Sequence, residues 1–142
     1  MSQTADTMRP KLIGGLVGAG IATSFCIIST LTQLIPPRSA VPDPVKTIPL
    51  TALYAYLAYC NARAFGRTYR LINQQPAATP TQAYNQLAAL HWNFALTGTA
   101  YTARALVPEV QIVPALIDSV FTAGFVAGAY NCKKKANAPK AA

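Results

Sequence analysis

Three long stretches of this chain carry almost no charge, and this feature limits the fold more than any other. Leu12–Ile35 and Ala83–Ala103 contain no Asp, Glu, Lys or Arg, and Val110–Cys132 contains only Asp118. Each stretch is as long as the run of about 20 apolar residues that crosses a hydrocarbon core as a helix. The stretches therefore predict helices that lie in a bilayer rather than in a soluble domain.

A fourth stretch, Thr47–Ala62, is shorter but also uncharged, and it is rich in tyrosine, whose ring suits the membrane interface. Charged residues make up 11% of the sequence, against about 25% in typical soluble domains. We therefore expect an all-α, polytopic membrane protein, in which residues 1–142 form a single membrane domain built as a four-helix transmembrane bundle. The predicted helices cover approximately residues 12–35, 47–70, 83–103 and 110–132, with polar tails at both ends.

The basic residues sort by their position relative to these helices. One side of a four-span arrangement holds nine of them: Arg9, Lys11, Arg63, Arg67, Arg70, Lys133, Lys134, Lys135 and Lys140. The other side holds three: Arg38, Lys46 and Arg104. The positive-inside rule then places both termini on the same cytoplasmic, matrix or stromal face. The basic residues form no nucleic-acid-binding motif, so the net charge of +8 does not predict a nucleic-acid partner.

Three of these basic residues, Arg63, Arg67 and Arg70, recur at positions i, i+4 and i+7. A helix that continues past the membrane would carry all three on one face. Two interpretations are open at this point. The stripe is either a basic flank that sets the topology, or a headgroup site for an anionic lipid such as cardiolipin.

Residue types that carry catalysis or bind metals are scarce. The cysteines Cys26, Cys60 and Cys132 are far apart and lie in or beside apolar stretches, which predicts packing roles. One His and four acidic residues do not supply the ligands of a standard zinc or di-iron centre. No phosphate-binding, dinucleotide-binding or haem-attachment motif occurs, so we expect no metal, no cofactor and no enzyme activity. Gly14 and Gly18 form a GxxxG pair, which predicts close helix packing.

Asp118 is the acidic residue inside a predicted span, where an ionisable group is a candidate functional residue. Counting the helix rise, Asp118 falls at the depth of Thr97, whereas His91 lies about 9 Å nearer the inner face. Thr97 or Tyr101 is therefore the expected partner. We expect a neutral, hydrogen-bonded acid that joins two helices, because a proton relay needs a second titratable group at the same depth.

The segment around the single histidine carries a pattern found in a known family. Tyr84-Asn85, five residues and then His91-Trp92-Asn93 resembles the first signature of the membrane-associated eicosanoid and glutathione metabolism (MAPEG) family. Ala62-Arg63 lies where that family often has a basic pair, and Ala123-Gly124-Phe125-Val126 lies near its Gly-Arg-Val. The resemblance covers about residues 48–131. It implies a glutathione-dependent membrane enzyme whose basic loop after the second helix faces glutathione.

Several positions depart from that family. Ala89 and Leu96 replace its Arg and Glu near the signature, and Phe125 and Gly128 replace an Arg and a Tyr of its third helix. Binding glutathione and stabilising its thiolate need those cations and hydrogen-bond donors. The departures therefore predict that His91 and Asn93 make polar contacts between helices rather than bind a ligand.

These observations predict a non-catalytic accessory or structural membrane subunit of a large energy-transducing complex. We expect the respiratory chain or ATP synthase of a mitochondrial inner membrane, with both termini on the matrix side. The expected partners are other membrane subunits and an anionic lipid, cardiolipin first. The alternatives are a MAPEG-type glutathione transferase and a small transporter or lipid-binding membrane protein. The predicted helix contact residues are Asp118, Thr97, His91 and Asn93.

Overall fold

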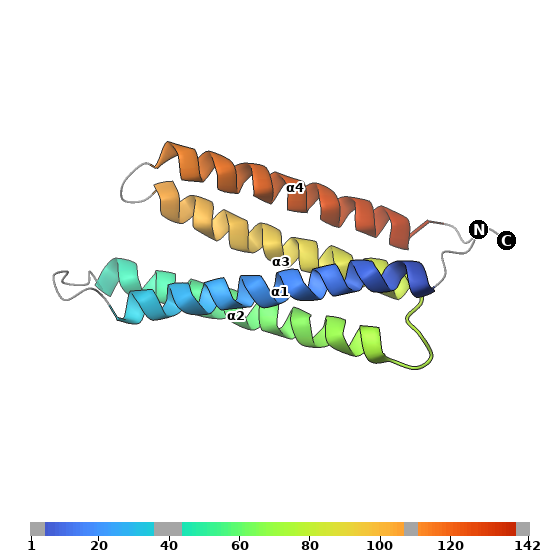
Figure 1. The fold of residues 1–142 in the computed structure, drawn as a ribbon. Coiled ribbons are helices and arrows are strands. Elements are labelled where there is room, and N and C mark those ends of the chain that lie inside the picture. The colour runs from blue at the N-terminus through green and yellow to red at the C-terminus, as the bar shows by residue number, and fades with distance from the viewer. Residues whose placement is uncertain (1–4, 36–43, 107–110, 139–142) are drawn as a thin grey trace.

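The computed structural model describes residues 5–35, 44–106 and 111–138, which contain four α-helices and no strand. The helices are α1 (Ala5–Leu34), α2 (Pro44–Asn73), α3 (Pro80–Leu106) and α4 (Ile112–Ala136). They run alternately up and down, so that α1 begins and α4 ends at the same end of the bundle, which we call the termini end (Figure 1). The prediction of an all-α, four-helix fold is confirmed for the described residues.

The helices do not stop where the apolar stretches stop. α1 already includes Arg9 and Pro10, although the predicted helix starts at residue 12, and α4 continues through Lys133, Lys134 and Lys135, although the predicted helix ends at residue 132. Lysines in the last turn favour the helix, since they lie beside the negative end of its dipole. The predicted start of the fourth helix at residue 110 lies outside the described residues.

Prolines and one capping motif set the helix starts. Pro44 and Pro80 are the first residues of α2 and α3, a position where the missing backbone N–H costs nothing. Before α3, the backbone N–H of Gln82 donates to Thr79 Oγ1 at 3.2 Å, and that of Thr79 donates to Gln82 Oε1 at 2.9 Å. This reciprocal capping box satisfies two N–H groups that the first helical turn leaves open.

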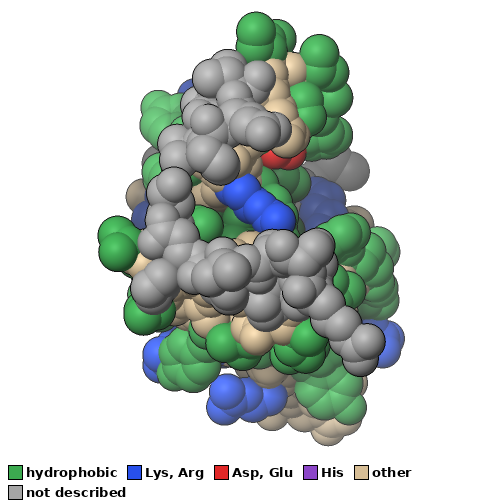
Figure 2. All heavy atoms as spheres, turned by 90° about the vertical axis from the view of Figure 1, so that its left-hand side faces the viewer, with side chains coloured by type: hydrophobic (Ala, Val, Ile, Leu, Met, Phe, Trp, Pro, Cys, Tyr) green, Lys and Arg blue, Asp and Glu red, His purple; other side chains and the backbone are tan. Residues whose placement is uncertain are grey.

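The four helices pack as two antiparallel pairs that are joined through α3. α1 packs along α2 and α3 packs along α4, while α3 also contacts both α1 and α2. Among the described helices, α4 packs against α3 alone. Only 11% of the most apolar segment of α4 is therefore buried, and only 22% of that of α1. Seen from the end opposite the termini end, hydrophobic side chains cover much of the outer edge of the molecule (Figure 2).

Two of the described helices are long and apolar enough to cross a membrane: Thr7–Leu34 within α1, and Ile112–Ala136, which is α4. α2 and α3 have the length but fall below the same hydropathy limit. α3 carries several amides and a histidine within its helical segment, among them Gln86, His91 and Asn93. Whether α2 and α3 can also lie in a bilayer therefore depends on the partners that their polar side chains find.

The buried side chains form two apolar clusters, one toward each end of the bundle. The cluster at the termini end consists of Met8, Leu12, Ala19, Ala64, Ala83, Tyr84, Leu87, Leu90 and Ala136. The other cluster consists of Cys26, Tyr54, Leu57 and Ala100. Polar residues such as Asn61 and Thr97 are buried as well. Cys26 is fully buried, as a packing role requires, whereas Cys60 and Cys132 are only partly buried.

The predicted GxxxG pair is split between two environments. A β-carbon at Gly18 would lie 3.1 Å from the Phe94 ring of α3, so this glycine does permit a close helix contact. A β-carbon at Gly14 would meet no atom within 4 Å. Gly15 rather than Gly14 shares the contact with α3, because a β-carbon there would lie 2.6 Å from Leu90 Cδ1.

Candidate functional site

Polar side chains meet along the interface between α2 and α3. Near the termini end, Gln86 Nε2 donates to Thr68 Oγ1 at 2.9 Å. About two turns further along α3, Asn93 Nδ2 donates to the Cys60 carbonyl at 3.3 Å. A third contact joins Asn61 to Thr97. We call this set of residues the polar ladder: Cys60, Asn61 and Thr68 of α2 with Gln86, Asn93 and Thr97 of α3.

Asn61 is the most deeply buried member of the polar ladder. Its side chain is completely buried, and its Nδ2 donates to Thr97 Oγ1 at 3.1 Å and to the Leu57 carbonyl at 3.0 Å. The Thr97 hydroxyl donates in turn to the Asn93 carbonyl at 2.9 Å. Asn61 is not among the contact residues that the sequence pattern predicted. Its signal was available, since an amide within the uncharged stretch Thr47–Ala62 has to find a partner inside the protein.

A second polar contact joins α1, α2 and α3 nearer the opposite end. The hydroxyls of Ser29 and Tyr101 lie 2.6 Å apart, which links α1 to α3. The Tyr101 ring lies 5.3 Å from the Tyr54 ring of α2, centroid to centroid. The Arg104 guanidinium lies 5.9 Å from the Tyr54 centroid, within the range of a cation–π contact. Tyr101, which the sequence analysis named as a possible partner of Asp118, therefore contacts α1 and α2.

The expected contact between Asp118 and Thr97 is absent: within the described residues Thr97 bonds to Asn61, and Asp118 makes no hydrogen bond. The rise per residue gives the depth of a side chain along the helix, but it does not give the neighbouring helix toward which that side chain points. Gly98 faces Thr122 of α4, since a β-carbon at Gly98 would overlap the Thr122 hydroxyl. Adjacent helix residues point about 100° apart, so Thr97 faces α2 instead. In this antiparallel pair, Asp118 then lies level with residue 102, about 7.5 Å further along α3 than Thr97.

His91 packs against α4. Its Nδ1 lies 2.7 Å from the Leu87 carbonyl of its own helix, and its ring lies 6.1 Å from the Phe125 ring, edge to face. A β-carbon at Gly128 would overlap the imidazole, so the absence of a side chain at that position makes room for the ring. The structure therefore separates the two signature residues that were predicted to make helix contacts: Asn93 lies at the α2–α3 interface and His91 at the α3–α4 interface.

The arginine stripe is also divided. Arg63 and Arg67 line a groove of about 210 Å³ between α2 and α3, together with Tyr59, Cys60, Ala64, Gln86, Ala89, Asn93 and Tyr56. Arg70 does not line this groove, and its Nε donates to the Gly66 carbonyl of its own helix at 3.4 Å. The structure thus brings two of the three predicted lipid-binding residues to one groove, which we call the α2–α3 groove.

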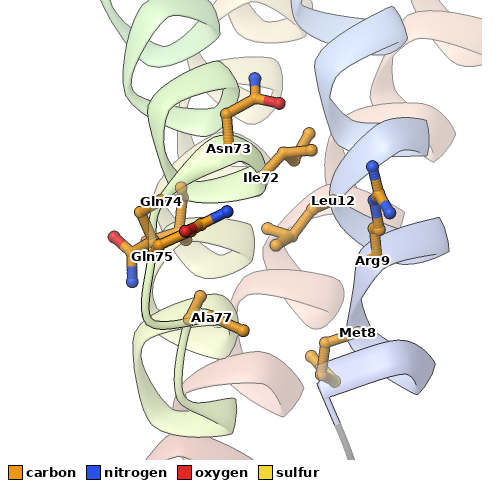
Figure 3. A pocket seen from close by; sticks show the side chains of 10 residues that line it. Met8, Arg9, Leu12, Ile72, Asn73, Gln74, Gln75 and Ala77 are labelled. Atoms are coloured by element: carbon orange, nitrogen blue, oxygen red, sulfur yellow. The ribbon is translucent and has the colours of Figure 1, made fainter.

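A third basic residue lies at a cavity of about 340 Å³ at the termini end, between the start of α1 and the connection from α2 to α3. Figure 3 shows Arg9, Met8 and Leu12 of α1 on one side of it and Asn73, Gln74 and Gln75 on the other. The Arg9 guanidinium and the side-chain amides of Asn73, Gln74 and Gln75 line this cavity together with apolar side chains. This cavity therefore offers hydrogen-bonding groups at the end of the bundle where the basic residues gather.

The described residues contain no group of three or more His, Cys, Asp or Glu side chains that could hold a metal ion. Their three cysteines are free thiols. What the arrangement provides chemically is interhelical hydrogen bonds, cations at grooves and a large apolar exterior. Comparisons with protein-family models, with curated proteins and with solved structures found no match. The MAPEG resemblance therefore stays a prediction.

Proposed function

We propose that this chain is a polytopic membrane protein with four spans that acts as a non-catalytic subunit of a larger membrane assembly. The observation that carries the proposal is the placement of polar and apolar groups. The buried members of the polar ladder, Asn61, Thr68 and Thr97, lie inside, between the two less apolar helices, while α1 and α4 present large apolar side chains outward. Ile21, Phe25, Ile117 and Val120 are each more than half exposed. A water-soluble bundle has the opposite arrangement.

Interhelical hydrogen bonds and small residues hold helices together where lipid supplies no hydrophobic drive. That principle explains why α2 and α3 are paired despite their lower hydropathy. It also explains why a polar side chain in either helix is acceptable in a bilayer, since each ladder contact shields a polar group from lipid. Four spans are therefore consistent with only two strongly apolar helices.

The surface of α4 supports a role as a subunit. Of the three other described helices it packs on α3 alone, and on its remaining surface Ala123, Gly124 and Ala127 are exposed among large apolar residues. A β-carbon at Gly124 would meet no atom within 4 Å. Small residues spaced this way let a second helix approach closely. A helix of a partner subunit would cover this surface.

The host that we propose is an energy-transducing complex of the mitochondrial inner membrane, either of the respiratory chain or ATP synthase. The organelle follows from the type of subunit proposed. Within such a membrane, the placement of nine basic residues on one side of the four-span arrangement and three on the other supports an orientation with both termini on the matrix side. The proposed lipid partner is an anionic phospholipid, cardiolipin first, held at the α2–α3 groove by Arg63 and Arg67.

The test is co-purification of the tagged full chain in mild detergent, followed by native electrophoresis and identification of stoichiometric partners. We expect a complex far larger than the chain. Gly124→Leu should reduce its yield without unfolding the chain, because the position is open in the isolated bundle. The matched control is Gly66→Leu, at a position that is also open but lies on α2, and it should leave the yield of the complex unchanged. A self-trimer that conjugates glutathione would instead establish the MAPEG-type transferase.

A further inference from the structure

A second basic groove lies between α1 and α4, with α3 as its floor. It encloses about 370 Å³ and shares no lining residue with the α2–α3 groove. Lys11 and Gly14 of α1 form one wall, and Cys132 and Lys135 of α4 form the other. We call it the α1–α4 groove. α1 and α4 make no direct backbone approach to each other, so the groove lies open between them above α3.

Two positive charges converge at one end of the α1–α4 groove. The Nζ atom of Lys11 lies 5.7 Å from the centroid of the Tyr84 ring, and that of Lys135 lies 5.8 Å from it. Neither lysine has an ion pair among the side chains that the structure describes. Both ammonium groups line the same groove and lie near the same ring, so an anion held at this end of the groove would be attracted to both. This end of the groove is therefore complementary to an anionic group.

Apart from His91, the rest of the groove is lined by apolar side chains and glycines, and it has a defined length. Leu87, Leu90 and Phe94 line its floor. Gly14 leaves open space along its wall, and the Phe94 ring closes the far end against Gly18, at 3.1 Å from where a β-carbon would lie. From Tyr84 to Phe94 the helix rises about 15 Å. This is half of a hydrocarbon core of about 30 Å, which is the depth of one leaflet.

We infer that the α1–α4 groove binds an anionic phospholipid, with the headgroup phosphate between Lys11 and Lys135 and one acyl chain along Leu87, Leu90 and Phe94. The inference rests on the proposed function, because the groove meets a phospholipid only if the chain lies in a bilayer. The lysines hold the phosphate as point charges at the interface. The glycines of α1 keep the acyl path open.

Two variants separate the headgroup contact from the acyl path. Lys11→Gln with Lys135→Gln removes both cations, and Arg9→Gln with Lys134→Gln is the control, since it removes equal charge from residues that do not line the groove. Gly14→Leu adds a side chain to the wall of the groove at a position where a β-carbon meets no atom within 4 Å, and its thermal midpoint in detergent checks that the fold is kept. Gly66→Leu is its control, because that position is equally open and lies on α2.

Binding is measured by native mass spectrometry of the detergent-purified full chain, in a background of Arg63→Gln and Arg67→Gln that silences the α2–α3 groove. The probes are phosphatidylglycerol, phosphatidylcholine and inorganic phosphate. We expect phosphatidylglycerol to bind most tightly. The double lysine variant should weaken it about 30-fold, roughly fivefold for each cation, and Gly14→Leu should abolish it. Both controls should bind as the parent does.

Other outcomes overturn the inference. Unchanged phosphatidylglycerol binding in the lysine and Gly14→Leu variants would exclude the groove as a lipid site. Inorganic phosphate that binds as tightly as the lipid, and that Gly14→Leu does not displace, would assign the lysines to a free anion. Carbonate extraction of the same wild-type membranes separates the two proposals. A chain released into the supernatant overturns the proposed function and this inference together, whereas a retained chain with unchanged binding overturns this inference alone.

Discussion

Asn61 shows how one buried amide ties two helices together. Its Nδ2 is shared between Thr97 Oγ1 and the Leu57 carbonyl, while its Oδ1 has no hydrogen bond among the described residues. An interhelical hydrogen bond in a membrane protein contributes about 0.6 kcal/mol on average. We therefore expect a double-mutant cycle of Asn61→Ala and Thr97→Val to give a coupling energy of about that size, measured by unfolding in detergent.

The control for this cycle is Thr99→Val combined with Asn61→Ala. The Thr99 hydroxyl donates only to the Ala95 carbonyl of its own helix and is exposed, so the two changes should be additive. Additive behaviour of Thr97→Val as well would mean that the contact at 3.1 Å contributes nothing to stability.

Asp118 leads to a different expectation from the one its sequence position suggested. It is half-buried on α4 and makes no hydrogen bond among the described residues. Asp118→Asn and Asp118→Leu should therefore both leave the thermal midpoint of the detergent-solubilised chain no lower than that of the wild type. Leu should also improve membrane insertion, because an acidic residue at a span centre costs about 3 kcal/mol. If Asp118→Leu alone lowers the free energy of unfolding by more than about 1 kcal/mol, Asp118 makes the interhelical hydrogen bond that the sequence predicted.

At the scale of the elements, the α3–α4 pair depends on glycines that make room for side chains of α3. Gly128→Ala would force the His91 ring to move, because the added β-carbon overlaps the imidazole. Overpacking of this kind costs about 1–3 kcal/mol. Gly124→Ala, one turn earlier on the same helix, meets no atom within 4 Å and should be neutral or gain up to about 1 kcal/mol from helix propensity. Equal stability of the two variants in thermal unfolding would contradict this contact.

The α2–α3 groove gives a prediction about lipid. Arg63→Gln with Arg67→Gln should lower the cardiolipin or phosphatidylglycerol that co-purifies with the chain, since each cation near an anionic surface contributes about 1 kcal/mol. Arg70→Gln is the matched control, because Arg70 does not line the groove. Lipid bound per chain is measured by native mass spectrometry. If occupancy does not change in the double variant, the stripe serves as a topology signal only.

For the whole molecule, the four spans that we propose would put both chain ends on one side of the membrane. Cysteine labels placed at Ser2 and at Ala142 should react from the same face, and a label at Arg38 from the opposite face. The reason is the order of the four described helices, in which α1 begins and α4 ends at the termini end. The native cysteines need to be replaced first, since all three are free thiols. Labelling of the two ends from opposite faces would exclude four spans.

The sequence by itself determined that the chain folds as four helices and which stretch forms the centre of each one, but not where each helix begins and ends. Long uncharged stretches separated by prolines admit little else, since helix formation depends on local backbone geometry and on the residues within one segment. The sequence also determined which side chains were polar enough to need partners, among them Thr97, His91 and Asn93.

Only the tertiary structure decided which partners these side chains have. Depth along a helix follows from residue number, but the direction of a side chain relative to a neighbouring helix depends on which helices are adjacent. That is why Thr97 contacts Asn61 rather than Asp118, and why Arg70 is excluded from the groove of Arg63 and Arg67. It is also why Lys11 and Lys135, at opposite ends of the sequence, meet over one tyrosine ring. Contacts between helices depend on packing of the whole bundle, which no single segment encodes.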